Sequence, residues 1–174
     1  MKQLQSFLFL LFLSLVFGQS FGKNRDAHQS RPINEATGIV TRIIDGDTFS
    51  MRVKRKTIRM RLAQIDAPEN GQKYFRRSQQ SLRELIGKKS VNVYWREKDP
   101  YGRPVVQVVV EGKNINVEQV KRGMAWVAPG YVKDPFLFVL EDKARNAGLG
   151  LWKENSPIPP WVWRHRRKPS GSSK

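Results

Sequence analysis

The chain has 174 residues, with 32 Lys and Arg against 15 Asp and Glu, so its formal net charge is +17. This length corresponds to one globular domain with extensions, and 39% hydrophobic residues are enough for a folded core. The sequence contains no cysteine, which excludes disulfides, thiol catalysis and cysteine-ligated metals. The two histidines, His28 and His165, lie near the chain ends. Catalysis in the middle of the chain must therefore use carboxylates and arginines, with or without a hard metal ion.

The first segment, residues 1–22, resembles a secretory signal peptide. Lys2 is its only charge, residues 7–17 are apolar apart from one serine, and small residues follow. We expect cleavage after Ser20 or Gly22, which predicts a secreted or periplasmic protein with no stable membrane association. The alternative is an uncleaved anchor, although the apolar run is shorter than the ~20 residues that span a bilayer.

Strand patterns dominate residues 38–112. Apolar residues lead into Asp45-Gly46-Asp47, which is typical of a hairpin turn, and apolar positions alternate again over residues 49–53. In the next strand Arg59 and Arg61 alternate with apolar positions, so we expect Arg61 on the face away from the core. The sequence predicts five strands, over residues 40–44, 49–53, 58–62, 91–95 and 105–110.

Three helices are predicted from apolar spacing and capping residues. The first starts at Phe75 and stops at Gly87, and the second starts with Asn116 as its cap. The third is capped by Asp134 and stops at Gly148. Five strands with a helix between the third and the fourth match a small closed barrel of the OB type. The predicted fold is therefore α+β, mainly β: a five-stranded OB-fold barrel with about three helices.

The last segment is rich in Pro, Trp and Arg, and its prolines predict an extended chain rather than a helix. One interpretation is that Trp161 and Trp163 stack on single-stranded nucleic acid while the following arginines bind phosphate. The other, which we favour, is that both tryptophans pack on the domain and the last residues are solvated. The predicted organisation is a signal peptide (1–22), a flexible arm (23–36), a barrel domain (37–153) and this extension (154–174).

Three short segments, residues 44–48, 61–69 and 99–103, carry the candidate chemistry. Four of the 15 carboxylates lie within 25 positions in the first two segments, and their repulsion is costly unless cations offset it. A divalent ion would do so. Without cysteine or a central histidine the ligands are all oxygen, which favours Ca²⁺ or Mg²⁺ over zinc or copper. These carboxylates are Asp45, Asp47, Asp66 and Glu69.

Two arginines accompany the carboxylates. Arg61 lies on the polar face of its strand, and Arg103 follows a glycine-containing turn. A planar guanidinium matches phosphate oxygens better than a lysine ammonium does. A metal ion, two arginines and a spare carboxylate together predict a site for a phosphodiester.

The three segments, their order, their spacing and Gly-Leu-Trp at 150–152 resemble the staphylococcal nuclease (thermonuclease) family over roughly residues 38–152. The tail sequence Pro-Pro-Trp-x-Trp-Arg is similar to that of chromosomal bacterial members. The resemblance implies an OB-barrel endonuclease with one Ca²⁺ ion. Water would attack phosphorus in line and leave 3′-phosphate ends on DNA or RNA. We expect a monomer with a preference for single-stranded substrates.

The resemblance also implies a role for each residue. Ala67 stands where the best-known member has threonine, but a main-chain carbonyl ligand does not depend on the side chain. Glu69 would orient or deprotonate the attacking water. The metal ligands would be Asp47, Asp66 and the main-chain carbonyl of Ala67, with Asp45 as an auxiliary carboxylate beside the metal, and Arg61 and Arg103 would clamp the scissile phosphate.

A non-catalytic module that binds nucleic acid is the alternative, because a net charge of +17 supports binding equally well through counterion release. The acidic cluster argues against it. A pure binder has no use for carboxylates that face a polyanion without a metal. Glu69, Arg61 and Arg103 together favour the enzyme.

Overall fold

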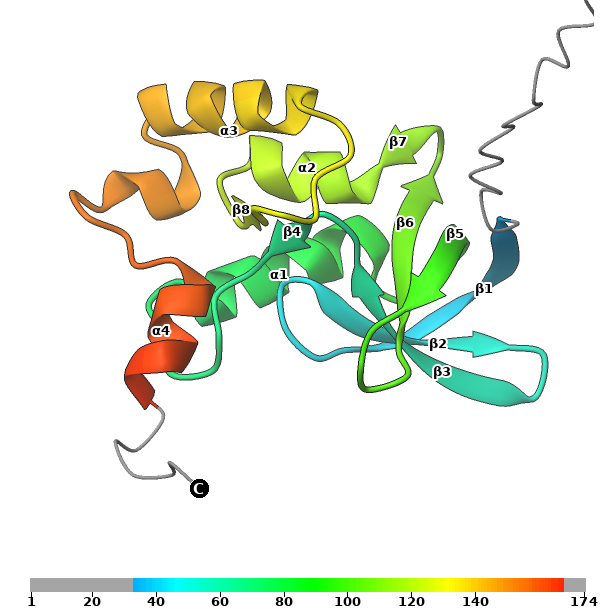
Figure 1. The fold of residues 1–174 in the computed structure, drawn as a ribbon. Coiled ribbons are helices and arrows are strands. Elements are labelled where there is room, and N and C mark those ends of the chain that lie inside the picture. Colours follow the sequence, from blue (N-terminus) through cyan, green and yellow to red (C-terminus); the bar gives the residue numbers. More distant parts are fainter. Residues whose placement is uncertain (1–32, 168–174) are drawn as a thin grey trace, which may run out of the picture. The chain divides into compact units, whose positions relative to one another are not determined.

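A computed structural model describes residues 33–167 (Figure 1). The predicted signal peptide, residues 23–32 of the predicted arm and residues 168–174 lie outside the described residues. Between residues 33 and 167, no helix is long and apolar enough to cross a membrane.

Five strands form a closed barrel, as the sequence predicts. Neighbouring strands pair antiparallel in the order β3-β2-β1-β5-β6, and β3 closes the barrel by pairing parallel with β6 at Arg61↔Val105 and Leu62↔Val106. Because β1 begins at Asn34, residues 34–36 of the predicted arm belong to the barrel. The five strands are β1 (Asn34–Ile43), β2 (Thr48–Val53), β3 (Lys56–Leu62), β5 (Ser90–Lys98) and β6 (Pro104–Val110).

Three two-residue strands complete the sheets. β4 (Ile65–Asp66) pairs antiparallel with β8 (Trp126–Val127), outside the barrel. β7 (Lys113–Asn114) extends the edge of β6. The pairing with β8 holds Asp66, which follows shortly after the end of β3 along the chain.

Alternating strand positions fill the barrel. Side chains in a strand point to opposite faces in turn, so buried residues recur at every second position and most of their neighbours are half-buried or exposed. Phe49, Met60 and Leu62 are at most 1% exposed, whereas Arg59 lies on the outer face. The inward residues of the main strands are Val40, Phe49, Met51, Met60, Leu62, Val91, Val93, Val106 and Val108.

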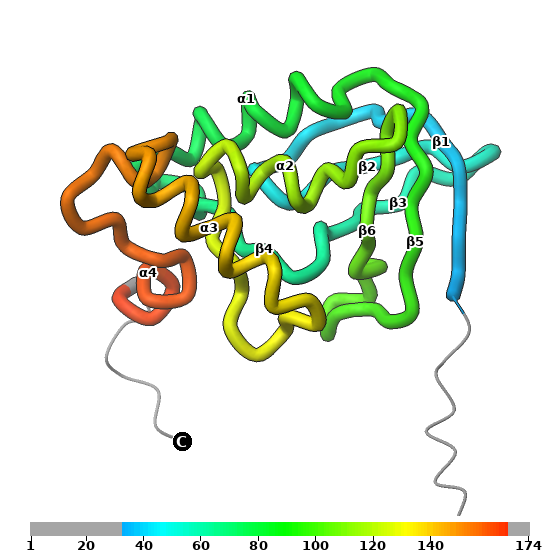
Figure 2. The backbone as a smooth tube through the Cα atoms, turned by 90° about the horizontal axis from the view of Figure 1, so that it is seen from above, coloured from blue at the N-terminus to red at the C-terminus, as the bar shows by residue number. Residues whose placement is uncertain are grey.

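Helices cover one side of the barrel, and α2 lies between α1 and α3 in both views (Figures 1 and 2). The first predicted helix is confirmed as α1, and the third as α3, where Asp134 Oδ1 accepts the N–H of Phe136 at 2.9 Å. The helices are α1 (Phe75–Ile86), α2 (Ile115–Lys121), α3 (Phe136–Asn146), the short 3₁₀ helix η1 (Gly150–Lys153) and α4 (Pro160–Arg167).

The predicted cap of α2 is wrong: Asn114, not Asn116, caps the helix. Asn114 Oδ1 accepts the N–H groups of Asn116 and Val117 at 3.0 and 3.3 Å. The Asn116 side chain instead turns into the barrel, where its Oδ1 accepts the Val108 N–H and its Nδ2 donates to two carbonyls. Both asparagines suit a cap locally, so only the tertiary contacts separate them.

Asn116→Ala is expected to lower the free energy of unfolding by about 2–4 kcal/mol, because it removes the amide that pairs with two interior backbone groups. The groups are the Val108 N–H and the Ala63 carbonyl, 3.1 and 3.0 Å from the amide, whereas the Val106 carbonyl keeps the Ala63 N–H at 2.8 Å. Urea unfolding followed by fluorescence measures the change. The control is Asn92→Ala on the exposed face of β5. Equal losses in the two variants would contradict the assignment.

The C-terminal segment is not extended throughout as the sequence predicts, because its residues 160–167 form α4. Pro160 occupies the first helical position, where a missing N–H costs nothing, and the Trp163 N–H bonds the carbonyl of Pro159 at 3.0 Å. Trp161 packs against the cluster of Trp126, Ala144, Leu151 and Trp152. This packing agrees with the favoured interpretation for Trp161, while Trp163 is half-buried.

Candidate active site

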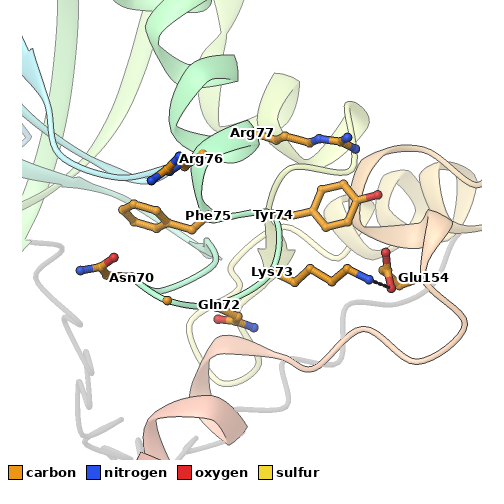
Figure 3. A pocket seen from close by; sticks show the side chains of 9 residues that line it. Asn70, Gln72, Lys73, Tyr74, Phe75, Arg76, Arg77 and Glu154 are labelled. Carbon is orange, nitrogen blue, oxygen red and sulfur yellow. Dashed lines mark hydrogen bonds and ion pairs between the residues drawn. The ribbon is translucent and has the colours of Figure 1, made fainter.

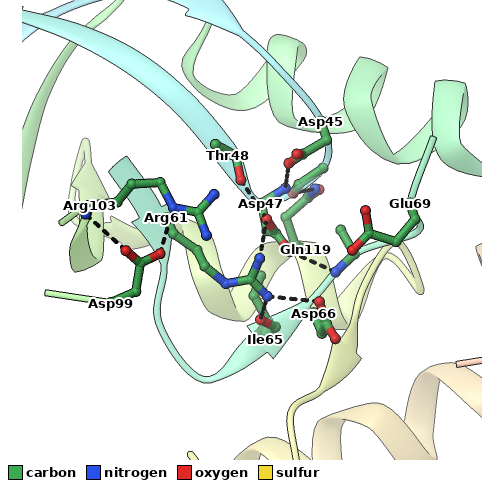
Figure 4. A network of polar contacts seen from close by, with 12 residues as sticks. Asp45, Asp47, Thr48, Arg61, Ile65, Asp66, Glu69, Asp99, Arg103 and Gln119 are labelled. Carbon is green, nitrogen blue, oxygen red and sulfur yellow. Dashed lines mark hydrogen bonds and ion pairs between the residues drawn. The ribbon is translucent and has the colours of Figure 1, made fainter. Parts of the chain in front are cut away.

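The loop between β1 and β2 meets the end of β3 and the short strand β4, and this meeting brings the predicted carboxylates together (Figure 4). Thr48 pairs with Arg61 across β2 and β3, so the loop that carries Asp45 and Asp47 lies beside the Arg61 side chain. Asp66 comes from β4, and Glu69 follows shortly after it.

The Asp47 carboxylate is buried, and both of its oxygens accept hydrogen bonds from neighbouring residues. Its Oδ2 accepts the N–H of Ala67 at 2.8 Å, and its Oδ1 accepts the Thr48 hydroxyl at 2.8 Å and Arg61 Nη1 at 3.1 Å. Burial raises the pKa of Asp47 to about 7 against the opposing effect of Arg61, and the charges of Asp45 and Asp66 add to the rise. A carboxylate in this position gains from any further cation that can lie beside it.

Two helices hold the Asp45–Asp47 loop. Gly46 leaves no room for a side chain, because a Cβ there would lie 1.7 Å from Ser78 Oγ on α1. The Gly46 carbonyl accepts Gln119 Nε2 of α2 at 2.7 Å, and Gln119 is fully buried. Asp45 Oδ1 accepts the N–H of Asp47 at 3.0 Å. The sequence analysis missed the support from Ser78 and Gln119, since it lies more than 30 positions away along the chain.

Arg61 joins the two aspartates, on the polar face that the sequence predicts. Its Nη1 bonds Asp47, and its Nη2 bonds Asp66 Oδ1 at 2.7 Å and the carbonyl of Ile65 at 3.3 Å. Burial opposes the charge of Arg61, but Asp47 and Asp66 outweigh it and raise its pKa above the ordinary value. One guanidinium therefore fixes the separation of both predicted metal ligands.

A third arginine, which the sequence analysis did not assign to the site, contacts the same carboxylates. Arg164 of α4 donates from Nη2 to Asp66 Oδ2 at 2.7 Å, and from Nη1 to Asp66 Oδ1 at 3.2 Å and Glu69 Oε1 at 2.6 Å. The hydrogen bond to Asp66 is the main reason that the pKa of Arg164 is raised. The only signal in the sequence is the basic run that follows the tail tryptophans.

Arg103 enters from the turn between β5 and β6, and Asp99 orients it. Asp99 Oδ2 accepts Arg103 Nε at 2.5 Å, while Oδ1 accepts the N–H groups of Tyr101 and Arg103. These hydrogen bonds from Arg103 and Tyr101 lower the pKa of Asp99 in spite of its burial. Figure 4 shows the terminal nitrogens of Arg103 turned toward the side of the cluster that carries Arg61.

For the phosphodiester site that the sequence predicts, Asp99→Asn is expected to lower the rate constant of hydrolysis by about 10- to 100-fold, because Arg103, the residue predicted to bind phosphate, loses its orientation. The amide oxygen still accepts the N–H groups of the turn, but the amide NH₂ cannot accept Arg103 Nε. Steady-state kinetics measures kcat, and thermal melting confirms the fold. Asp142→Asn, at an exposed position of α3, is the control. A wild-type kcat for Asp99→Asn would show that Asp99 does not position Arg103.

A pocket of about 690 Å³ opens beside the segment that follows Glu69 (Figure 3). Residues 70–77 and Glu154 line it. Its wall includes three cationic side chains, of which Lys73 pairs with Glu154 at 2.5 Å and Arg77 stacks on Tyr74 with its Cζ 5.0 Å from the ring centroid. The third is Arg76. The positive charge of this wall favours an anionic ligand.

The predicted ligand atoms of the site are all oxygen, which suits a hard divalent cation. In residues 33–167, no group of three or more His, Asp or Glu side chains is gathered to hold a metal, but the predicted set needs only two carboxylates and a main-chain carbonyl. Asp47, Asp66 and Glu69 pair with the guanidiniums of Arg61 and Arg164, and Asp45 lies beside Asp47, so four carboxylates, when ionised, stand against two positive charges. The excess of two negative charges equals the charge of one divalent cation, and every donor is oxygen.

Residues 59–154 match the family described as staphylococcal nuclease homologue. The chain belongs to the staphylococcal nuclease family. It is 44% identical over 131 residues to an uncharacterized endonuclease of Escherichia coli O157:H7, an alignment that covers 75% of this chain and 86% of the relative. It is 41% identical over 142 residues to a micrococcal nuclease of Shigella flexneri, with 75% and 82% covered. An uncharacterized endonuclease of Haemophilus influenzae is 41% identical over 130 residues, with 74% and 73% covered.

Family membership and the names of these relatives support the first of the two predicted functions. The chain is a nuclease, a hydrolase that acts on nucleic acids. The structure of this nuclease brings five of the predicted side chains into one cluster and places Arg103 beside it. The clustered residues are Asp45, Asp47, Arg61, Asp66 and Glu69.

Proposed function

We propose that this nuclease cuts phosphodiester bonds with one Ca²⁺ ion held by Asp47, Asp66 and the main-chain carbonyl of Ala67, with Asp45 beside it. The observation that carries the proposal is the buried pair Asp47 and Asp66, which Arg61 bridges. All the donor atoms that this pair offers to a metal ion are oxygen. The ion would supply Lewis acidity and offset charge on the phosphate. The family resemblance favours calcium over magnesium.

The phosphate would be held by Arg61 and Arg103. Arg61 is tied to both aspartates and keeps a fixed direction, and Asp99 does the same for Arg103 through Nε. Fixed guanidiniums neutralise charge that grows on the phosphate oxygens without having to reorganise. Their contribution is therefore greatest in the transition state.

Glu69 would hold the attacking water and take its proton. It lies at the edge of the cluster, with a side chain that is 38% exposed, so water reaches it. Its main chain is fixed, because its N–H bonds Gln72 Oε1 at 2.9 Å. Water would attack phosphorus in line, the 5′ oxygen would leave, and the products would carry 3′-phosphate and 5′-hydroxyl ends.

The substrates would be DNA and RNA, with single strands preferred. The net charge of +17 favours any polyanion, and the cationic wall of residues 70–77 borders the segment that follows Glu69. A single strand bends more easily than a duplex does, so its scissile phosphate can reach the arginines. We further propose that the protein acts as a monomer. We also propose that it is exported through the signal-like segment 1–22, which N-terminal sequencing of the secreted form would test.

The test is product analysis on one labelled single-stranded DNA, with duplex DNA and RNA in parallel. The purified protein is assayed with Ca²⁺ and with Mg²⁺, and mass spectrometry identifies the new ends. The expected result is rapid cutting in Ca²⁺, with phosphate on the 3′ side of each cut. Products with 5′-phosphate ends would contradict the proposed mechanism. Equal rates in Ca²⁺ and Mg²⁺ would contradict the proposed cofactor.

A further inference from the structure

Arg164 belongs to α4, ten residues beyond the end of the matched family region at residue 154. It reaches back over more than 90 positions of sequence to Asp66 and Glu69. The contact is made with both terminal nitrogens, so it is a directed pairing and not a chance approach of surface charges.

The helix that carries Arg164 is held by contacts other than this arginine. Trp161 packs against the aromatic cluster that includes Trp126 and Trp152, and Gln72 Nε2 donates to the carbonyl of Ile158. Loss of the Arg164 side chain should therefore leave α4 in place. A change in the site can then be assigned to the guanidinium itself.

Both oxygens of Asp66 already accept guanidinium N–H groups. Arg61 and Arg164 share Oδ1, and Arg164 also bonds Oδ2. A carboxylate offers about four acceptor sites, and three donors already occupy Asp66, so a cation there competes with these guanidiniums for the same oxygens and is repelled by their charge. Arg61 also bonds Asp47 and the Ile65 carbonyl and is 23% exposed, whereas the Arg164 side chain is 45% exposed. Arg164 is therefore the donor that yields more easily.

We propose that Arg164 competes with the divalent cation for Asp66 and Glu69, so that α4 sets the cation concentration at which the nuclease becomes active. The proposal rests on the proposed cation site at Asp47 and Asp66. When the cation binds, Arg164 leaves Asp66 for solvent or for the substrate phosphate. The competition raises the cation concentration needed for half-occupancy, and the C-terminal helix becomes a regulatory element of the site.

The test is calorimetric titration of Ca²⁺ into the whole protein without nucleic acid, so that binding is measured apart from hydrolysis. Arg164→Gln is expected to bind Ca²⁺ about tenfold more tightly than the wild type, because it removes a charge-assisted pairing with the ligand carboxylate. Arg164→Lys should lie between them, since a single ammonium cannot bond both oxygens at once. Arg166→Gln, at an exposed position of the same helix, is the control and should match the wild type.

An unchanged affinity in Arg164→Gln would overturn the competition. A weaker affinity would overturn it as well, and would show instead that Arg164 holds the ligands in position. Circular dichroism and thermal melting of each variant establish that α4 and the barrel are intact. If neither the wild type nor any variant binds Ca²⁺, both the proposed calcium site and the proposed competition are wrong. If all of them bind Ca²⁺ with the same affinity, only the proposed competition is wrong.

Discussion

Glu69→Gln is expected to reduce the rate constant for DNA hydrolysis at saturating Ca²⁺ by about 10²–10⁴-fold, the range associated with a positioned general base. The amide has almost the same shape but cannot accept the proton of the attacking water. Because the carboxylate lies 38% exposed at the edge of the cluster, the substitution should leave the fold intact. Single-turnover kinetics on a labelled oligonucleotide measures the rate constant of the chemical step.

The control for this variant is Glu84→Gln, which removes an equivalent charge from an exposed position of α1. It should hydrolyse DNA at the wild-type rate. Melting temperatures of both variants should stay near that of the wild type. If Glu69→Gln retains more than about a tenth of the activity, a proton-accepting role for Glu69 is excluded, because even modest general-base catalysis supplies more than that.

Arg61→Lys is expected to lower the rate constant by about 10²–10³-fold although it keeps the positive charge. The Arg61 guanidinium bonds Asp47 Oδ1, Asp66 Oδ1 and the carbonyl of Ile65 at once. A lysine ammonium is a compact point charge that cannot reproduce this planar fork. The variant should lose both the bridge between the aspartates and the directed contact with the phosphate.

Arg59→Lys gives a matched control on the same strand, two residues away on the outer face. It should preserve both the rate and the melting temperature. The comparison separates the geometry of the Arg61 guanidinium from the general effect of an arginine on β3. Retention of activity in Arg61→Lys to within a few-fold would mean that charge alone suffices at this position.

The barrel could be predicted because its signals are local. Apolar alternation in β2 and β3 and the Asp-Gly-Asp turn determine which side chains face inward, and they place Arg61 opposite the core. The acidic cluster is inferred from four carboxylates close together in the sequence and from the family resemblance, and the pairing of Thr48 on β2 with Arg61 on β3 brings the loop before β2 to the end of β3. Each of these contacts joins segments that are close in sequence.

The features that could not be predicted depend on contacts between distant segments. Asn114 and Asn116 are both good caps, and only the barrel carbonyls that Asn116 bonds decide between them. The prolines of the tail predicted an extended chain, yet Pro160 begins a helix, and Trp161 of this helix packs against the domain. Arg164 could not be assigned to the site from sequence, because its partners lie 95 and 98 positions earlier.

The measurement that tests the site most directly is hydrolysis of one single-stranded DNA by the purified protein in Ca²⁺, after addition of a chelator, and after Ca²⁺ is restored, with Glu69→Gln carried through the same cycle. We predict that the wild type cuts in Ca²⁺, stops in chelator and resumes at its former rate. The variant should remain near background throughout. Cutting by the wild type that persists in chelator, or full activity of the variant in Ca²⁺, would contradict a calcium-dependent site built on this cluster.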